Sequence, residues 1–329
     1  MSFHIIVARD FDHMSRVAAE AIRIRIARTL VERGTFVLGL AAGHSPVGVY
    51  RHLAEAFNDG RLDVSRVRSF NLDEYVGLPG EDPPSRARHP GSFASAMSRD
   101  FFGLLRGKFA DARLPAGHLV EPGTLIRELQ AHPGDWQEQG VGNGKAIVIR
   151  PDAESEGLRR IRSGILDAYE REIRRAGGID LQIVGVGEHG HVAFHESGIP
   201  FEGNRMLLVK LADSTVANAV ADGHFARPDD CPRYAISMGA ELIYEARCVV
   251  LLASGRRKAG PVAASLAGNP TPTVPISYSQ ICARRGNEMI YVIDREAAPG
   301  VLARRAEIEK HGIEIEDLSG TDSAGAPAK

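Results

Sequence analysis

The feature that most constrains the fold of this chain is a regular alternation of short apolar runs with longer stretches of helical apolar spacing. Residues 3–8 form a β-like run, and residues 14–33 then carry apolar side chains at helical intervals up to Gly34, a natural helix stop. Further apolar runs lie at residues 35–40, 67–72, 146–149, 180–186, 206–211, 248–253 and 289–293. Alternating strands and helices predict an α/β fold with a single doubly wound, mostly parallel sheet and helices on both faces, in a Rossmann-like arrangement.

The length of 329 residues is sufficient for one large domain with a sizeable core. We expect a single domain over residues 1–317, with an insertion at about residues 115–157, where many prolines and glycines interrupt any regular period. Residues 318–329 are small and polar, and they predict a disordered tail.

Composition excludes several classes of partner. A formal net charge of −2 argues against nucleic acid held by bulk electrostatics. The three cysteines are far apart and odd in number, which favours a reducing compartment over a disulfide framework. The first residues lack the pattern of a signal peptide, and no apolar run is long enough to span a bilayer. We therefore expect a cytoplasmic protein with no membrane partner.

The most informative stretch is GVGEHGHVAFHESG, residues 185–198, which follows an apolar run and places three histidines and two glutamates among four glycines. Open α/β sheets bind ligands at the carboxyl ends of their strands, so we interpret this stretch as an active-site loop. If the loop is extended, His189 and His191 lie on the same side of it, with His195 and Glu196 following. The alternative is a glycine-rich surface loop that happens to carry histidines.

Two further stretches favour an anionic ligand. In AAGHSP, residues 41–46, small residues precede a helix with Ser45 as N-cap and Pro46 at its first position, which leaves backbone N–H groups open to a phosphate. A plain tight connection between strand and helix explains this turn equally well. In SGRRK, residues 254–258, three cations begin a helix, where they oppose the helix dipole unless an anion binds there. A solvated basic turn is the alternative.

A pair of neighbouring carboxylates, Asp73 and Glu74, ends the apolar run at residues 67–72. This is again where an α/β sheet places reactive groups. Because side chains alternate along a strand, only one of the two can easily face a site. A solvated turn or a helix cap is the alternative for both.

Together these motifs resemble the glucosamine-6-phosphate deaminases, a family of the sugar-phosphate isomerase-like superfamily that also holds the 6-phosphogluconolactonases. LGLAAGHSPVGVY resembles LGLPTGGTPxxxY, SFNLDEYVGLP is nearly identical to FNMDEYVGLP, and GVGEHGHVAFHESG resembles GxGxDGHIAFNEPG. PRYAISMG and SGRRKA resemble PKYALTxG and GxxKA. The five motifs occur in the family's order, and the resemblance covers about residues 1–310 apart from the insertion and a proline-rich loop at residues 80–92.

The resemblance implies an enzyme that converts an amino-sugar phosphate to a ketose phosphate and ammonia, without a metal or an organic cofactor. Asp73 matches the general base, His191 matches the histidine that assists ring opening, and Glu196 matches a carboxylate that orients it. Proton transfer of this kind needs a positioned carboxylate and a group that titrates near pH 7. The predicted catalytic residues are Asp73, His191, Glu196 and His189, and the predicted phosphate-binding residues are Gly43, His44, Ser45 and Lys258.

Four residues depart from the family's pattern. His189 stands where the family has an aspartate beside the catalytic histidine, and Thr215 stands where it has a phosphate-binding arginine. His44 replaces a glycine, and Cys282 replaces a histidine. We expect these changes to cluster at the site and to alter the substrate, with Arg256 or Arg257 able to compensate for the lost arginine.

Three other interpretations remain open. The first is a hydrolase like the 6-phosphogluconolactonases, and the second is a sugar-phosphate sensor that has lost catalysis. The third is a metal site built from His189, His191, His195 and Glu196, since all four are ligand types. The sequence predicts a small sugar phosphate as partner and leaves open whether the chain forms a homo-oligomer.

Overall fold

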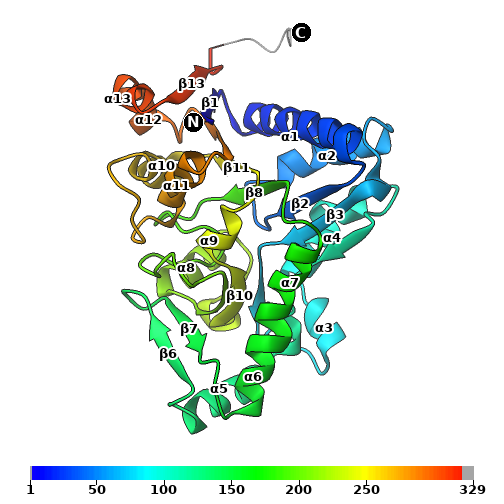
Figure 1. Cartoon of the computed structure of the whole chain (residues 1–329), viewed down its shortest axis with the longest axis vertical. Coiled ribbons are helices and arrows are strands. Elements are labelled where there is room, and N and C mark those ends of the chain that lie inside the picture. Colours follow the sequence, from blue (N-terminus) through cyan, green and yellow to red (C-terminus); the bar gives the residue numbers. More distant parts are fainter. Residues whose placement is uncertain (1, 321–329) are drawn as a thin grey trace.

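The chain folds around two β-sheets that lie one below the other in Figure 1. The computed structural model describes residues 2–320. The larger sheet has eight strands in the order β13-β1-β12-β11-β8-β2-β3-β5, all of them parallel. Its strands are β1 (Phe3–Ala8), β2 (Phe36–Leu40), β3 (Val67–Asn71), β5 (Asp111–Arg113), β8 (Leu181–Gly185), β11 (Cys248–Ala253), β12 (Glu288–Asp294) and β13 (Ile313–Asp317).

The smaller sheet is antiparallel and has the order β4-β10-β9-β7-β6. Its strands are β4 (Asp73–Val76), β6 (Trp136–Gln139), β7 (Lys145–Ile149), β9 (Met206–Lys210) and β10 (Tyr234–Met238). The prediction of an α/β fold with a mostly parallel sheet is confirmed. The prediction of one single sheet is wrong, because the described residues form two.

The second sheet was missed because residues 67–76 look like one extended stretch followed by a turn. In the structure β3 ends at Asn71, and β4 begins at Asp73 in the other sheet. Leu72 joins the sheets: its N–H donates to the Leu40 carbonyl at 2.9 Å, and its carbonyl accepts from the Met238 N–H at 2.8 Å. Asp73 therefore lies at the junction of the two sheets.

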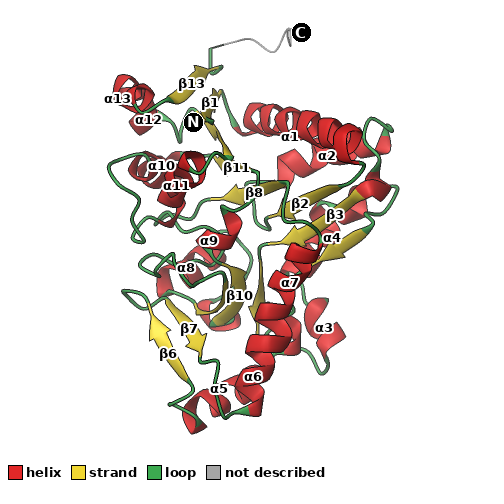
Figure 2. Cartoon of the chain, viewed as in Figure 1, coloured by secondary structure: helices red, strands yellow, loops and turns green. Residues whose placement is uncertain are grey.

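Helices cover both faces of the large sheet (Figure 2). The helices are α1 (Phe11–Arg33), α2 (Val47–Asn58), α3 (Pro83–Ala87), α4 (Phe93–Asp100), α5 (Pro122–Ala131), α6 (Glu156–Ile161), α7 (Asp167–Arg175), α8 (Asp213–Ala221), α9 (Ala240–Ile243), α10 (Ala259–Ser265), α11 (Ser279–Arg284), α12 (Pro299–Ala303) and α13 (Arg305–Lys310). A π-helical turn at Arg162–Leu166 joins α6 to α7.

Strand β11 shows how the core is divided. Val249 and Leu251 pack in the cluster that contains α7 and α9, whereas Val250 and Leu252 pack in the cluster that contains α1 and α2. Successive side chains of a strand point to opposite faces. Because both faces are covered, β11 is apolar along its whole length, as expected for a central parallel strand.

The segment at residues 115–157 extends the smaller sheet. It contains α5 and the hairpin of β6 and β7, and β7 pairs antiparallel with β9. The strand expected at residues 146–149 is present as β7, whereas β4, β5, β6, β10 and β13 were not predicted. Whether this segment is an insertion in a single domain stays a prediction. In the predicted tail, the Leu318 N–H donates to the Val7 carbonyl at 2.8 Å, and residues 321–329 lie outside the described part of the chain.

Among residues 2–320, no helix is both long enough and apolar enough to cross a bilayer.

Candidate active site

A cavity of about 520 Å³ opens where β2, β8 and β11 end and β4 begins. The parallel strands of the large sheet deliver their connecting loops to this edge, as open α/β sheets generally do. Six of the eight predicted site residues line the cavity, namely Gly43, His44, Ser45, Asp73, His191 and Lys258. They come from four separate parts of the chain, so the fold brings together what the sequence shows far apart.

Asp73 faces this cavity from the start of β4, and only 6% of its surface is exposed. No donor among residues 2–320 makes a hydrogen bond to its carboxylate. Burial raises the pKa of Asp73 well above its ordinary value, and the neighbouring Glu74 raises it further. A carboxyl group in this state holds a proton more strongly than an ordinary aspartate, which suits it to accept a proton as a general base.

Glu74, by contrast, is turned away from the cavity and caps α4. Its carboxylate accepts hydrogen bonds from the N–H groups of Tyr75, Phe93 and Ala94, each at 2.9 Å, and from Ser92 Oγ at 3.2 Å. A carboxylate at a helix N-terminus satisfies backbone donors that would otherwise lack partners. The structure thus decides between the two neighbours: Asp73 faces the site, and Glu74 holds the structure beside it.

His191 lines the cavity, and Glu196, which does not line it, pairs with His191 from behind. His191 Nδ1 lies 3.8 Å from Glu196 Oε2, and Glu196 Oε1 accepts a hydrogen bond from the Ala212 N–H at 3.0 Å. Burial lowers the pKa of His191, while Glu196 raises it and Lys258 lowers it. The imidazole is therefore neutral near pH 7 and can exchange a proton with a ligand.

Gly187 makes room for this imidazole. A Cβ atom at Gly187 would lie 2.1 Å from Cε1 and Nε2 of His191, a distance that side chains cannot adopt. The Gly187 N–H also donates to the His191 carbonyl at 3.0 Å. The ring of His191 is thus seated directly on the Gly187 backbone, which explains one of the glycines in the loop.

The turn after β2 lines the cavity with Gly43, His44 and Ser45. Gly43 has a φ of 102°, a left-handed conformation that favours glycine. The His44 ring stacks on Phe11 with 5.5 Å between centroids. The prediction of Ser45 as N-cap is wrong: α2 begins at Val47 with Pro46 in the cap position and no side-chain cap. The Ser45 side chain lines the cavity instead.

The turn after β11 places Lys258 on the cavity, and burial lowers the pKa of its ammonium group. Asp294, at the end of β12, holds this turn. Its carboxylate accepts from the Gly255 N–H at 3.0 Å, from the Ala297 N–H at 2.9 Å and from Ser254 Oγ. A cation held close to the small residues of the first turn is suited to bind a phosphate group.

Known proteins are similar to this chain over most of its length. A sequence profile described as glucosamine-6-phosphate isomerases/6-phosphogluconolactonase matches residues 149–288. The glucosamine-6-phosphate deaminase of Halothermothrix orenii is 34% identical over 297 residues, which is 89% of this chain and 98% of that protein. That of Clostridioides difficile is 33% identical over 295 residues, 89% of this chain and 95% of that protein. The chain belongs to the glucosamine-6-phosphate deaminase family.

Solved structures agree with this assignment. A monomeric glucosamine-6-phosphate deaminase has a TM-score of 0.66 and 26% identity, covering 90% of this chain and 98% of that one. A 6-phosphogluconolactonase from Thermotoga maritima has a TM-score of 0.55 and 16% identity, covering 89% of this chain and 100% of that one. The second likeness shows a shared fold alone.

Of the four departures from the family's pattern, only two line the cavity, so the expectation that all four cluster there is wrong. His44 and Thr215 are cavity residues, whereas His189 and Cys282 are not. Cys282 lies in the core on α11, where burial raises the pKa of its thiol to about 12. His189 influences the site indirectly, since a charge on it lowers the pKa of His191. Its catalytic role stays a prediction.

His195 has a structural role in the loop. It is fully buried, its Nε2 lies 3.0 Å from the Ile199 carbonyl, and its Nδ1 accepts from the Ala240 N–H at 3.1 Å. Burial lowers its pKa to about 4. Both ring nitrogens of His195 are therefore engaged by backbone groups, so His195 is not available as a ligand in the metal site considered above.

Helix α8 brings Thr215, Asn218 and Ala219 to the cavity, and Asp222 follows at its end. Thr215 is 6% exposed, and its Oγ1 has no hydrogen-bond partner among residues 2–320, so it is free to bind a ligand. The family's pattern marks Thr215 as a site position, whereas nothing in the local sequence indicates the contacts of Asn218, Ala219 and Asp222.

The two arginines before Lys258 behave differently. Arg256 is 89% exposed at its side chain and does not line the cavity, so it cannot replace the family's arginine. Arg257 lines the cavity but pairs with Glu188 at 2.8 Å and Asp222 at 2.9 Å. It thereby ties the active-site loop to the end of α8.

An aromatic wall was also missed. Tyr75, Phe93 and Phe194 line the cavity, with ring centroids 4.9 Å apart for Tyr75 and Phe93 and 5.7 Å apart for Phe93 and Phe194. His224 packs on Phe93 at 6.4 Å and lines the cavity as well. Tyr75 could have been found, because it lies two residues after Asp73 on the same strand and therefore on the same side.

Proposed function

We propose that this protein acts on an amino-sugar phosphate as an aldose–ketose isomerase and deaminase, releasing ketose phosphate and ammonia. The observation that carries the proposal is the convergence of Asp73, the His191–Glu196 pair, Lys258 and the turn after β2 on one cavity. The relatives at 33–34% identity are named glucosamine-6-phosphate deaminases. The cavity thus combines a base, a proton shuttle and a cationic anchor.

In the proposed reaction, His191 exchanges a proton with the sugar ring and so opens it. Asp73 then takes the proton from the second carbon of the open chain and returns it to the first, while the oxygen on the first carbon takes up a proton and the amino group gives one up. The resulting imine at the second carbon is hydrolysed by water, which leaves a ketone and ammonia. These steps are proton transfers and a hydrolysis, and side chains with suitable pKa values supply them.

Phosphate binding is assigned to Lys258, Ser45 and the backbone at Gly43. His44 is proposed as an additional ligand, because Thr215 replaces the arginine of the family's pattern and Arg257 is engaged by two carboxylates. The Thr215 hydroxyl, which has no hydrogen-bond partner within residues 2–320, is suited to bind a sugar hydroxyl or a phosphate oxygen. The site therefore depends less on bidentate arginine contacts than the family's pattern does.

The test is to incubate the protein with a panel of amino-sugar and sugar phosphates and to follow ammonia and ketose together. Ammonia with ketose in equal amounts is the expected result. Ketose without ammonia would reduce the function to isomerisation, binding without turnover would favour a sensor, and hydrolysis of a sugar lactone phosphate would favour the lactonase alternative.

The role of Asp73 is tested by Asp73→Asn. We expect turnover to fall by about 10²- to 10⁴-fold, the usual contribution of a general base, while substrate binding is largely kept. The carboxamide is of the same size but cannot accept the proton. Kinetics of ammonia release, together with substrate binding by calorimetry, measure the two effects. Turnover at the wild-type rate would show that Asp73 is not the base.

A further inference from the structure

The hairpin of β6 and β7 ends in a turn, residues 140–144, that contacts the active-site loop through Gly144 and the backbone of Val141, while residues 141–143 are exposed. Val141 donates its N–H to the Gly198 carbonyl at 3.2 Å. Gly140 lies against Ile199, whose Cγ1 would be 3.1 Å from a Cβ built on the glycine. The Lys145 ammonium donates to the Gly140 carbonyl at 2.8 Å and so closes the turn on itself.

Gly144 is the residue of the turn that lies against Glu196 itself. A Cβ built on Gly144 would lie 3.0 Å from both Cβ and Cγ of Glu196 and 3.0 Å from Cβ of Ala212. Ala212 is the residue whose N–H holds Glu196 Oε1. The backbone of the turn therefore fills the space behind the Glu196 side chain and leaves it the rotamer in which Oε2 faces His191.

The same turn contacts the beginning of α8. Asn143 Nδ2 donates to Asp213 Oδ2 at 2.5 Å, and Arg233 binds the other oxygen of Asp213 at 3.1 Å. Because α8 supplies Thr215 and Asn218 to the cavity, the hairpin supports two of its walls at once.

We propose that the turn at residues 140–144 is a positioning element that holds Glu196 against His191 and fixes the start of α8 beside the cavity. The proposal rests on the proposed roles of His191 and Glu196. It assigns a function to the segment at residues 115–157, whose role the sequence does not reveal. A proton shuttle loses much of its rate when its partner moves by a fraction of an ångström, so such support affects catalysis directly.

The test compares Gly144→Ala with the matched control Gly134→Ala. Both glycines have ordinary φ values, but a Cβ at Gly134 meets nothing within 4 Å. We expect Gly144→Ala to lower kcat by about 3- to 10-fold with KM little changed, because it displaces Glu196 by tenths of an ångström. Gly134→Ala should behave as the wild type in both constants.

A second readout is the titration of His191, followed by NMR of its ring protons and assigned with His191→Gln. The charged and titratable groups that act on this ring are Glu196, Lys258, His189 and Glu188. Since Glu196 raises the pKa of His191, its displacement should lower that pKa in Gly144→Ala and move the acid limb of the kcat profile to lower pH. If the turn had a merely structural role, neither the pKa of His191 nor the acid limb of the kcat profile would change.

The same measurements on Glu196→Gln distinguish the proposed role of the hairpin turn from the proposed role of Glu196. If Glu196→Gln changes the His191 titration and Gly144→Ala does not, the hairpin is not a positioning element. If Glu196→Gln itself has no effect on titration or turnover, the proposed role of Glu196 fails, and the hairpin proposal fails with it.

If Gly144→Ala melts at a much lower temperature, Asn143→Ala gives the decisive result, because it only removes the hydrogen bond from an exposed side chain to Asp213. The loss should raise KM by about 2- to 10-fold, the usual effect of one hydrogen bond. An unchanged KM and kcat in a folded Asn143→Ala would overturn the support of α8.

Discussion

Asp73 and Glu74 are neighbours with the same side-chain chemistry, and their surroundings give them different roles. Asp73 faces a cavity and has no hydrogen-bond donor in the described part of the chain, whereas three backbone N–H groups satisfy Glu74. Alternation along a strand predicts that only one of them reaches the site. Which one does so depends on α4, whose N-terminus lies 19 residues further along the chain and could not be placed beside Glu74 from local pattern.

Glycine residues in the loop matter as much as its ionisable groups. In Gly187→Ala the new Cβ would overlap the His191 ring, so the ring must turn away from Glu196 or from the ligand. We expect kcat to fall by about 10²-fold, since misplacement of a catalytic group by about 1 Å has this effect. Steady-state kinetics test this against Gly164→Ala, where a Cβ meets only the Arg160 side chain at 3.8 Å. A His191 titration identical to that of the wild type would contradict the explanation.

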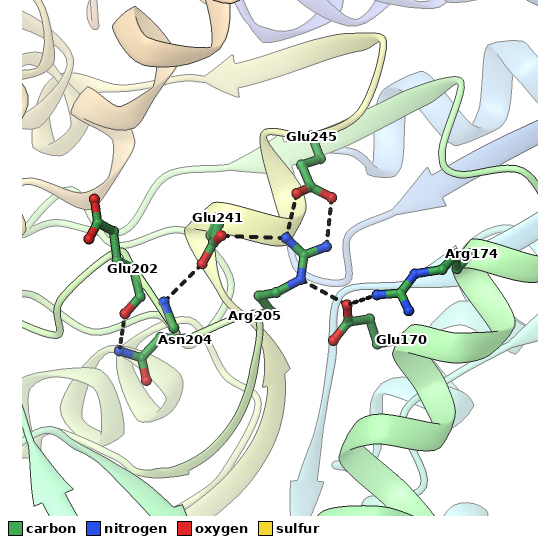
Figure 3. A network of polar contacts seen from close by, with 8 residues as sticks. Glu170, Arg174, Glu202, Asn204, Arg205, Glu241 and Glu245 are labelled. Carbon is green, nitrogen blue, oxygen red and sulfur yellow. Dashed lines mark hydrogen bonds and ion pairs between the residues drawn. The ribbon is translucent and has the colours of Figure 1, made fainter.

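At the level of elements, a network around Arg205 holds α7 and α9 to the start of β9 (Figure 3). Arg205 Nε donates to Glu170 Oε1 at 2.8 Å, its Nη2 donates to Glu245 Oε2 at 2.6 Å, and Glu241 lies 3.5 Å away. The beginning of α9 in turn contacts His195 of the active-site loop. These partners lie 35 to 40 residues apart, so no sequence period reveals them.

Replacing this cation should loosen α9. In Arg205→Met three carboxylates lose their common partner, and we expect a loss of about 1–3 kcal/mol in the free energy of unfolding, reduced by partial exposure. Urea unfolding at pH 7 measures it. Arg28→Met is the control, because Arg28 forms an exposed pair within α1 and should cost little. Equal losses for the two variants would show that the network adds nothing beyond a surface pair.

For the whole molecule, the buried His195 links stability to pH. Its pKa is about 4 in the folded protein, against an ordinary value of 6.5. The unfolded chain therefore binds a proton more readily, and stability is lost as the pH falls from 6.5 towards 4. Above pH 6.5 the residue is neutral in both states and contributes no pH dependence.

The variant that tests this is His195→Asn, which carries the residue of the family's pattern. We expect the difference in unfolding free energy between pH 8 and pH 5 to shrink by about 2 kcal/mol relative to the wild type. Chemical denaturation at the two pH values measures the difference, and comparison within each protein cancels any direct effect of the substitution. An unchanged difference would mean that His195 is not the group that titrates.

The amino-acid sequence alone was sufficient for eight of the thirteen described strands and for the segments that form the site. These properties depend on spacing within about ten residues, which the chain displays directly. It also showed that Asp73, His191 and Lys258 belong to family motifs. Six of the eight residues proposed for the site do line the cavity.

Other features exist only once distant segments meet. The division into two sheets depends on Leu72 bonding to Leu40 on one side and to Met238 on the other. The aromatic wall, the placement of the Thr215 hydroxyl on the cavity and the hairpin turn behind Glu196 likewise arise from contacts across long stretches of chain. Such contacts carry no local period, because packing in three dimensions selects them from many sequence-compatible pairings. Local spacing thus specifies the parts of this site, and long-range packing specifies how they work together.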